Sequence, residues 1–81
     1  MFIEVEVRYF ASLRSPGGPE RERLTLAGDD ARVLYAQLRD RFGWSFDVSA
    51  IRLAVNGRMV AWEHALANND EIAFLPPFSG G

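Results

Sequence analysis

Only one segment of this 81-residue chain has the apolar spacing of an α-helix, and it lies between segments with the alternation of β-strands. Its apolar residues recur at helical spacing on one face: Ala31, Leu34, Leu38 and Phe42. Asp30 precedes this stripe as an N-cap, and Gly43 follows it as the residue just past the helix end. A single amphipathic helix must bury its stripe against another layer, so one helix packed on one sheet is predicted.

The other regular segments predict five β-strands, because apolar and polar residues alternate along them or form short apolar runs. The expected strands are residues 2–10, 22–27, 51–55, 58–62 and 70–75. In the first strand, alternation places Val5, Val7 and Tyr9 on one face and charged residues on the other. Between the third and fourth strands, Asn56-Gly57 predicts a tight hairpin, since a type I′ turn needs φ > 0 at both central residues.

The predicted order of elements is β-β-α-β-β-β. A right-handed crossover then places the first and last strands side by side and parallel in the middle of the sheet. This is the α+β architecture called β-grasp, or ubiquitin-like: a mixed five-stranded sheet with one main helix on one face. We expect a β-grasp domain over residues 1–75 and an extended tail over residues 76–81.

The tail begins at Pro76-Pro77, which cannot continue a sheet ladder because proline has no backbone N–H. It continues through Phe78 and Ser79 to Gly80-Gly81. Extended, its six residues reach about 20 Å, far enough to enter the active site of another protein. The tail therefore suggests a carboxylate offered to an enzyme, and an ordinary frayed terminus is the alternative.

Composition excludes several classes of function. Without cysteine, the chain supplies no disulfide, thiolate metal ligand or thiol nucleophile. The net charge of −2 argues against a nucleic-acid partner. The sequence has no signal peptide and no apolar stretch long enough for a membrane, so a cytoplasmic location is expected. It also has no Gly-rich phosphate loop and no metal motif, so we expect no cofactor or metal bound by this chain.

The single histidine and two pairs of acidic residues could suggest a catalytic or metal site, but structural roles explain them more simply. His64 is the only histidine and has no catalytic partner at suitable spacing, so a surface position is expected. The pairs Asp29-Asp30 and Asp70-Glu71 are expected to cap the helix and form a turn rather than bind a metal.

The chain resembles the MoaD family, the small sulfur-carrier subunits of molybdopterin synthase in the ubiquitin-like ThiS/MoaD superfamily. The resemblance rests on Val55-Asn56-Gly57, on Leu66 and most specifically on the block from Asp70 to Gly81. Residues 7–14 are similar too. Asn69 stands where the family usually has glycine, and asparagine tolerates the left-handed conformation that such a turn requires.

The resemblance implies a carrier that is not catalytic alone and donates sulfur as a subunit of the synthase. An E1-like enzyme would use ATP to adenylate the Gly81 carboxylate, and a sulfur donor would convert it to a thiocarboxylate. Gly80 and Gly81 would thread into a MoaE-like large subunit, where the sulfur converts cyclic pyranopterin monophosphate to molybdopterin. The resemblance also implies a heterotetramer of two small and two large subunits.

A partner surface is also expected. Strand parity points Phe10, Met59 and Leu75 away from the core, and the resemblance marks these positions as the surface that docks the large subunit and the activating enzyme. The expected contacts also include Arg14 at the rim and four tail residues: Pro76, Pro77, Phe78 and Ser79. The alternatives are scattered surface apolar residues, a solvated Arg14 and a Phe78 folded back on its own domain.

Three other functions stay open from the sequence. The chain could carry sulfur for another pathway, thiamin synthesis or tRNA thiolation. It could be a ubiquitin-like protein modifier, with Gly81 joined to a target lysine. It could also be a β-grasp binding module with an inert tail, for which deletion of Gly81 would have no effect.

Overall fold

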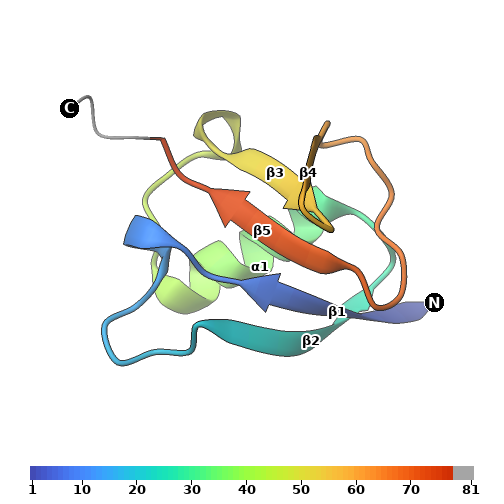
Figure 1. Cartoon of the computed structure of the whole chain (residues 1–81), viewed down its shortest axis with the longest axis horizontal. Coiled ribbons are helices and arrows are strands. Elements are labelled where there is room, and N and C mark those ends of the chain that lie inside the picture. Colours follow the sequence, from blue (N-terminus) through green and yellow to red (C-terminus); the bar gives the residue numbers. More distant parts are fainter. Residues whose placement is uncertain (78–81) are drawn as a thin grey trace.

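The computed structural model describes residues 1–77, which form five strands, one α-helix and two short 3-10 turns (Figure 1). In chain order these are β1 (Phe2–Arg8), η1 (Ala11–Leu13), β2 (Arg21–Ala27), α1 (Ala31–Phe42), η2 (Val48–Ala50), β3 (Arg52–Val55), β4 (Arg58–Val60) and β5 (Glu71–Leu75). Within residues 1–77, no helix is long and apolar enough to cross a membrane.

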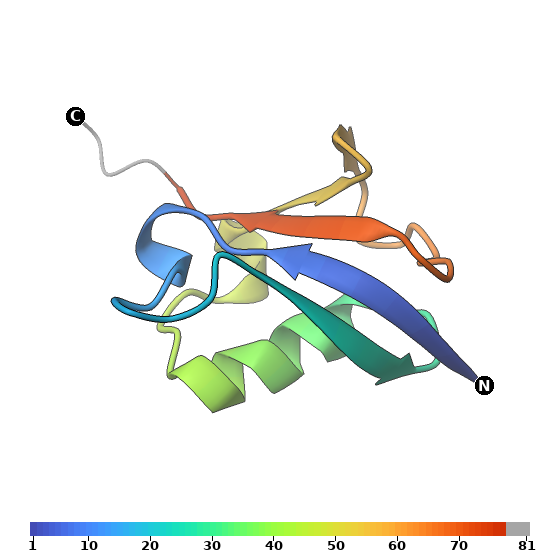
Figure 2. The same ribbon diagram turned by 60° about the horizontal axis from the view of Figure 1, so that its bottom comes forward.

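The five strands form one mixed sheet in the order β2-β1-β5-β3-β4. The central pair, β1 and β5, is parallel, and the other neighbours are antiparallel. Figure 2 shows α1 lying across one face of this sheet. The predicted β-grasp fold is therefore confirmed. We call the face turned away from α1 the outer face.

The ends of α1 form as the sequence predicts. The Asp30 carboxylate accepts a hydrogen bond from the Arg32 backbone N–H at 2.8 Å, which satisfies one of the free donors at the helix start. Gly43 takes the left-handed conformation, with φ of 71°, and its N–H donates to the Arg39 carbonyl at 2.8 Å. Only glycine reaches this conformation without steric cost, so Gly43 fixes where the helix ends.

The core lies between α1 and the inner face of the sheet. Ala31, Leu34 and Leu38 of the predicted stripe are buried there, whereas Phe42 is only partly buried at the end of the helix. The stripe prediction missed Tyr35, which is 2% exposed. The Tyr35 hydroxyl donates to the Phe46 carbonyl at 2.7 Å, and this bond lets a polar group enter the core.

Two strands end two residues earlier than predicted, and the other three begin one residue away from their predicted starts. The first strand ends at Arg8 rather than at residue 10, because η1 begins at Ala11 with a positive φ of 50°. The fourth ends at Val60 rather than at residue 62, since Trp62 turns away and its indole N–H donates to the Ile51 carbonyl at 3.2 Å. Leu66, in the segment between β4 and β5, is buried.

Candidate functional site

The outer face carries a group of apolar side chains whose places follow from strand register. Ala54 lies opposite Met59 on one side and opposite Ala73 on the other. Leu75 is the next outer-face residue of β5, and it lies opposite Arg52 of β3. Phe10 follows β1 with an extended backbone, so strand parity places its side chain on this face too. We call Phe10, Ala54, Met59, Ala73 and Leu75 the outer patch.

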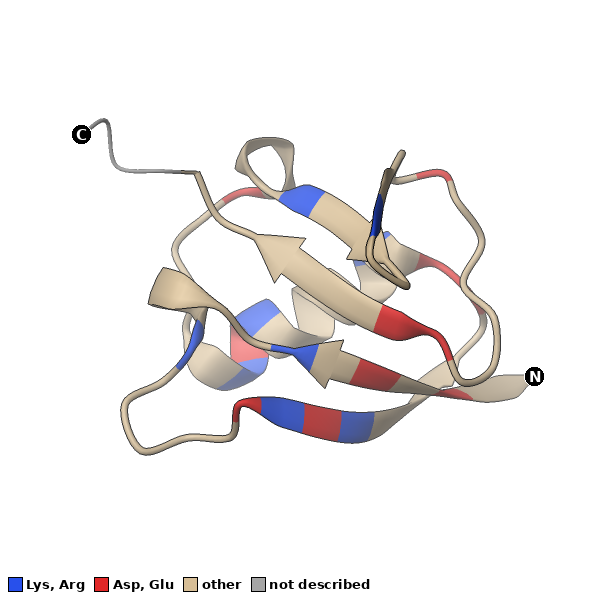
Figure 3. Ribbon diagram, viewed as in Figure 1, with Lys and Arg blue, Asp and Glu red and all other residues tan. Residues whose placement is uncertain are grey.

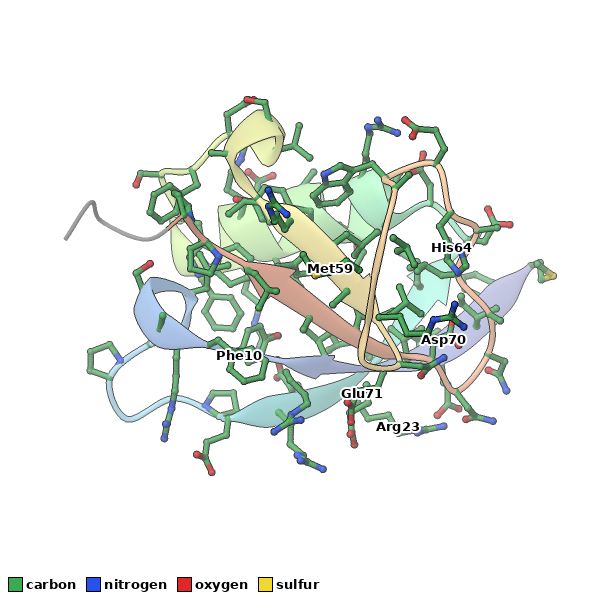
Figure 4. The ribbon with its side chains drawn as sticks, turned by 45° about the horizontal axis from the view of Figure 1, so that its top comes forward. Phe10, Arg23, Met59, His64, Asp70 and Glu71 are labelled. Atoms are coloured by element: carbon green, nitrogen blue, oxygen red, sulfur yellow. The ribbon has the colours of Figure 1, made fainter. Side chains whose placement is uncertain are left out.

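The outer patch combines large side chains at its margins with small ones between them. Phe10 and Met59 are 37% and 52% exposed, and Figure 4 shows them on opposite sides of β5. Ala54 is buried although it does not belong to the core cluster. We call these two small residues at the centre of the patch, Ala54 and Ala73, the alanine floor. The sequence analysis did not select Ala54 and Ala73, for which alanine at outward strand positions was the available signal.

The structure brings part of the predicted partner surface together. Phe10, Met59 and Leu75 share the outer face, as their parity predicts, while their role in partner binding stays a prediction. Pro76 and Pro77 follow β5 directly and lie outside the strand, Pro76 partly buried and Pro77 exposed. The other tail residues of the prediction lie outside the described residues: Phe78, Ser79, Gly80 and Gly81.

Arg14 lies beside Phe10 rather than beside Met59. Arg14 and Phe10 line a shallow pocket of about 190 Å³ at the end of β1. The Arg14 guanidinium forms an ion pair with the Glu20 carboxylate at 3.2 Å, and both side chains are largely exposed. An exposed pair of this kind contributes little to stability, so Arg14 can exchange Glu20 for another carboxylate.

Phe10 is positioned by its neighbour Tyr9, which is buried on the opposite face. The Tyr9 hydroxyl donates to Glu22 Oε1 at 2.8 Å, and Arg41 donates to both Glu22 oxygens at 2.8 and 2.7 Å. Burial, followed by the hydrogen bond to Glu22, raises the pKa of Tyr9 above its usual range. The hydrogen bonds from Arg41 are the main cause that lowers the pKa of Glu22. This network joins β1, β2 and α1 and fixes the chain entering Phe10.

Met59 is positioned by the hairpin before it. Asn56 and Gly57 have φ of 53° and 81°, as the predicted type I′ turn requires. Asp70 Oδ1 accepts a hydrogen bond from Asn56 Nδ2 at 2.9 Å, and Asn56 Oδ1 accepts one from the Glu71 N–H at 2.8 Å. Asn69 has a φ of 71°, which confirms the left-handed turn expected there.

Asp30 and Asp70, from the two acidic pairs of the sequence, hold the start of α1 and the turn before β5. Asp30 caps α1, and Asp70 Oδ2 accepts from the Ala67 N–H at 2.8 Å, so the predicted capping and turn roles are confirmed. The Asp29 carbonyl accepts from the Leu66 N–H at 2.9 Å. His64 is exposed on the loop after β4, as expected, and Figure 4 shows it well away from Phe10.

Comparison with known proteins gives a consistent set of matches. The sequence profile of the ThiS family matches residues 7–81. The molybdopterin synthase sulfur carrier subunit of Escherichia coli is 29% identical over 80 residues, covering 95% of this chain and 99% of that protein.

Two solved structures extend the match to the fold. The small archaeal modifier protein 1 of Haloferax volcanii has a TM-score of 0.72 and 30% identity, covering 96% of this chain and 99% of that one. A Helicobacter pylori complex of subunits 1 and 2 of the molybdopterin-converting factor contains a chain with a TM-score of 0.65 and 26% identity, covering 98% of this chain and 100% of that one.

Proposed function

We propose that this chain, which belongs to the ThiS family, is the sulfur-carrier subunit of a molybdopterin synthase. The observation that carries the proposal is the continuity between the outer patch and the tail. Leu75 is both a member of the patch and the last residue of β5, and Pro76 follows it directly. A partner docked on the patch therefore receives the start of the tail.

The chemistry we propose takes place at Gly81. A carboxylate is a poor electrophile, so an E1-like enzyme first joins it to the α-phosphate of ATP and releases pyrophosphate. A sulfur nucleophile then displaces AMP from the acyl adenylate, which leaves a thiocarboxylate on Gly81. In the large synthase subunit this sulfur passes to cyclic pyranopterin monophosphate, and water returns the carboxylate.

The outer patch supplies the docking surface in this proposal. Aromatic and methionine side chains are enriched at protein interfaces, and Phe10 and Met59 stand exposed at the margins of the patch. The alanine floor between them presents only small side chains, so a partner can approach the sheet closely there. The H. pylori complex supports a second subunit as the partner. We propose Arg14, Pro76, Pro77, Phe78 and Ser79 as further contacts with the same partner.

A second function is favoured by one specific observation. The small archaeal modifier protein 1 matches this chain as closely as the carrier subunit does in identity. We therefore keep a ubiquitin-like modifier as the alternative, in which Gly81 forms an isopeptide bond with a target lysine. Both functions need the same adenylation of Gly81, so the product formed after activation distinguishes them.

The test is the intact mass of the protein purified from its own cells with an N-terminal tag that leaves Gly81 free. The carrier function predicts a fraction heavier by one exchange of oxygen for sulfur and loss of that fraction when Gly81 is deleted. Conjugates to other proteins that vanish on the same deletion would support the modifier instead. Protein that also stays unmodified with ATP, an activating enzyme and a sulfur donor would contradict both functions.

A further inference from the structure

The outer face of the sheet carries charge as well as the outer patch. Four arginines and three glutamates lie on it according to strand register: Arg8, Arg21, Arg23, Arg52, Glu4, Glu6 and Glu71. The whole chain has a net charge of −2. This face is therefore more basic than the rest of the molecule, which indicates a partner surface of opposite sign.

Three of these arginines are already paired with the three glutamates. Arg23 and Glu4 are 2.7 Å apart, Arg21 and Glu6 are 3.4 Å apart, and Arg8 and Glu71 are 3.7 Å apart. The fourth arginine, Arg52, is exposed and forms no ion pair with any residue in the described range 1–77. The excess positive charge of this face is therefore located at Arg52.

Arg52 lies where the tail leaves the sheet. Its Cα is opposite that of Leu75, the last residue of β5. On the other side of β5, the Arg8 guanidinium lies 5.2 Å from the centre of the Phe10 ring. Figure 3 shows these basic positions on β3 and β1 on either side of β5, which is uncharged beyond Glu71. A partner that covers the outer patch and receives the tail must contact Arg52.

We infer that the partner of the outer patch presents an aspartate or glutamate carboxylate to the Arg52 guanidinium, and that this pair helps to select the partner. The inference rests on the proposed function, because it concerns the surface that docks the large synthase subunit. Covering Arg52 without a counter-charge leaves a desolvated cation, which weakens binding strongly. A surface with lysine or arginine at the facing position is therefore rejected, and one with a carboxylate is accepted.

Arg52 also increases the rate of encounter. An exposed cation beside the docking surface attracts an acidic partner over about one Debye length, and salt screens this attraction. Reversal of its charge therefore affects association more strongly at low salt than at high salt. Loss of an apolar contact within the patch weakens binding about equally at all salt concentrations.

The experiment measures binding of the full chain to the large molybdopterin synthase subunit of the same organism, at about 50 mM and about 300 mM NaCl. We expect Arg52→Gln to weaken binding several-fold and Arg52→Glu to weaken it by roughly tenfold or more at low salt. The association rate of Arg52→Glu should depend less on salt. The control is Arg32→Gln, because Arg32 lies on α1, on the other face of the sheet, and pairs with the exposed Glu63. This variant should bind like the unaltered chain.

A second measurement identifies the carboxylate. Acidic residues of the large subunit are changed to arginine one at a time, and we expect one of them to restore binding to Arg52→Glu. If Arg52→Glu binds with unchanged affinity and salt dependence while Met59→Asp abolishes binding, this inference is wrong and the proposed docking surface stands. If the unaltered chain does not bind the large subunit, or Met59→Asp binds normally, the docking proposal fails and the inference fails with it.

Discussion

Ala54 and Ala73 lie opposite each other across the β3–β5 ladder, on the face of the sheet that α1 does not cover. Strands usually place polar residues on an outward face, so two adjacent alanines there need a reason. Ala54 is 9% exposed because the neighbouring side chains of this face shield it. The pair keeps the centre of the outer patch low, and this shape leads to the first prediction.

A larger side chain in the alanine floor should weaken binding of the partner without unfolding the domain. We expect Ala54→Leu to weaken binding of the large synthase subunit by about tenfold or more, because the larger side chain raises the centre of the patch and holds the partner away from the sheet. The added carbons project away from the core, so the free energy of unfolding should change by less than about 1 kcal/mol. Titration calorimetry and urea unfolding measure the two quantities.

The matched control is Val33→Leu, which enlarges an exposed apolar side chain on α1. It should leave binding unchanged. Equal affinity of Ala54→Leu and the unaltered chain would show that the floor takes no part in docking.

The hairpin that carries Met59 depends on both the backbone and the side chain of Asn56. Asn56→Gly keeps the positive φ but removes the hydrogen bonds to Asp70 and Glu71, so we expect a loss of about 1–2 kcal/mol of stability. Asn56→Ala should lose about 1–2 kcal/mol more, because alanine is strained in the left-handed region. Urea unfolding measures both variants, and a glycine variant as stable as the unaltered chain would assign the effect to the backbone alone.

Local patterns predicted most of the fold because each element follows a single rule. Alternation located the five strands, Asp30 and Gly43 located the ends of α1, and Asn56-Gly57 located the hairpin. The parallel pairing of β1 and β5 followed from the handedness of the crossover.

The missed features depend on contacts between distant segments. Tyr35 enters the core only because the Phe46 carbonyl, eleven residues away, accepts its hydrogen bond. Ala54 is buried through its neighbours on two other strands. Arg52 was not selected from the sequence, because the absence of an ion pair becomes visible only when all the surrounding carboxylates are placed. Such properties belong to the assembled sheet and to no single segment.

A substitution at the end of α1 can show whether loss of stability alone weakens binding of the large subunit. A Cβ built on Gly43 meets no atom within 4 Å, so Gly43→Ala has space and suffers only from its φ of 71°. We expect a loss of about 1–2 kcal/mol in the free energy of unfolding. Gly43 ends α1, which packs on the other face of the sheet from the outer patch, so binding of the folded variant to the large subunit should not change. A weakened complex would mean that overall stability, rather than the patch, controls docking.

The network behind Phe10 should make stability depend on pH. Hydrogen bonds from Arg41 lower the pKa of Glu22 in the folded protein below the ordinary value of 4.5. A carboxylate with a lowered folded pKa stabilises the fold above its unfolded pKa, and this contribution disappears as pH falls through the folded value. We therefore expect Glu22→Gln to be less stable than the unaltered chain near neutral pH, with the difference shrinking as the pH falls below the ordinary value of 4.5.

Thermal unfolding followed by circular dichroism from about pH 7 to about pH 3 measures this difference. Glu63→Gln is the control: the pKa of Glu63 is also lowered, mainly by Arg32, but its side chain is 72% exposed. Water screens an ion pair that is this exposed, so its removal should change stability little at any pH. A Glu22→Gln curve that runs parallel to that of the unaltered chain would mean that the network holds Phe10 by packing of Tyr9 against Phe42 and Trp44 rather than by charge.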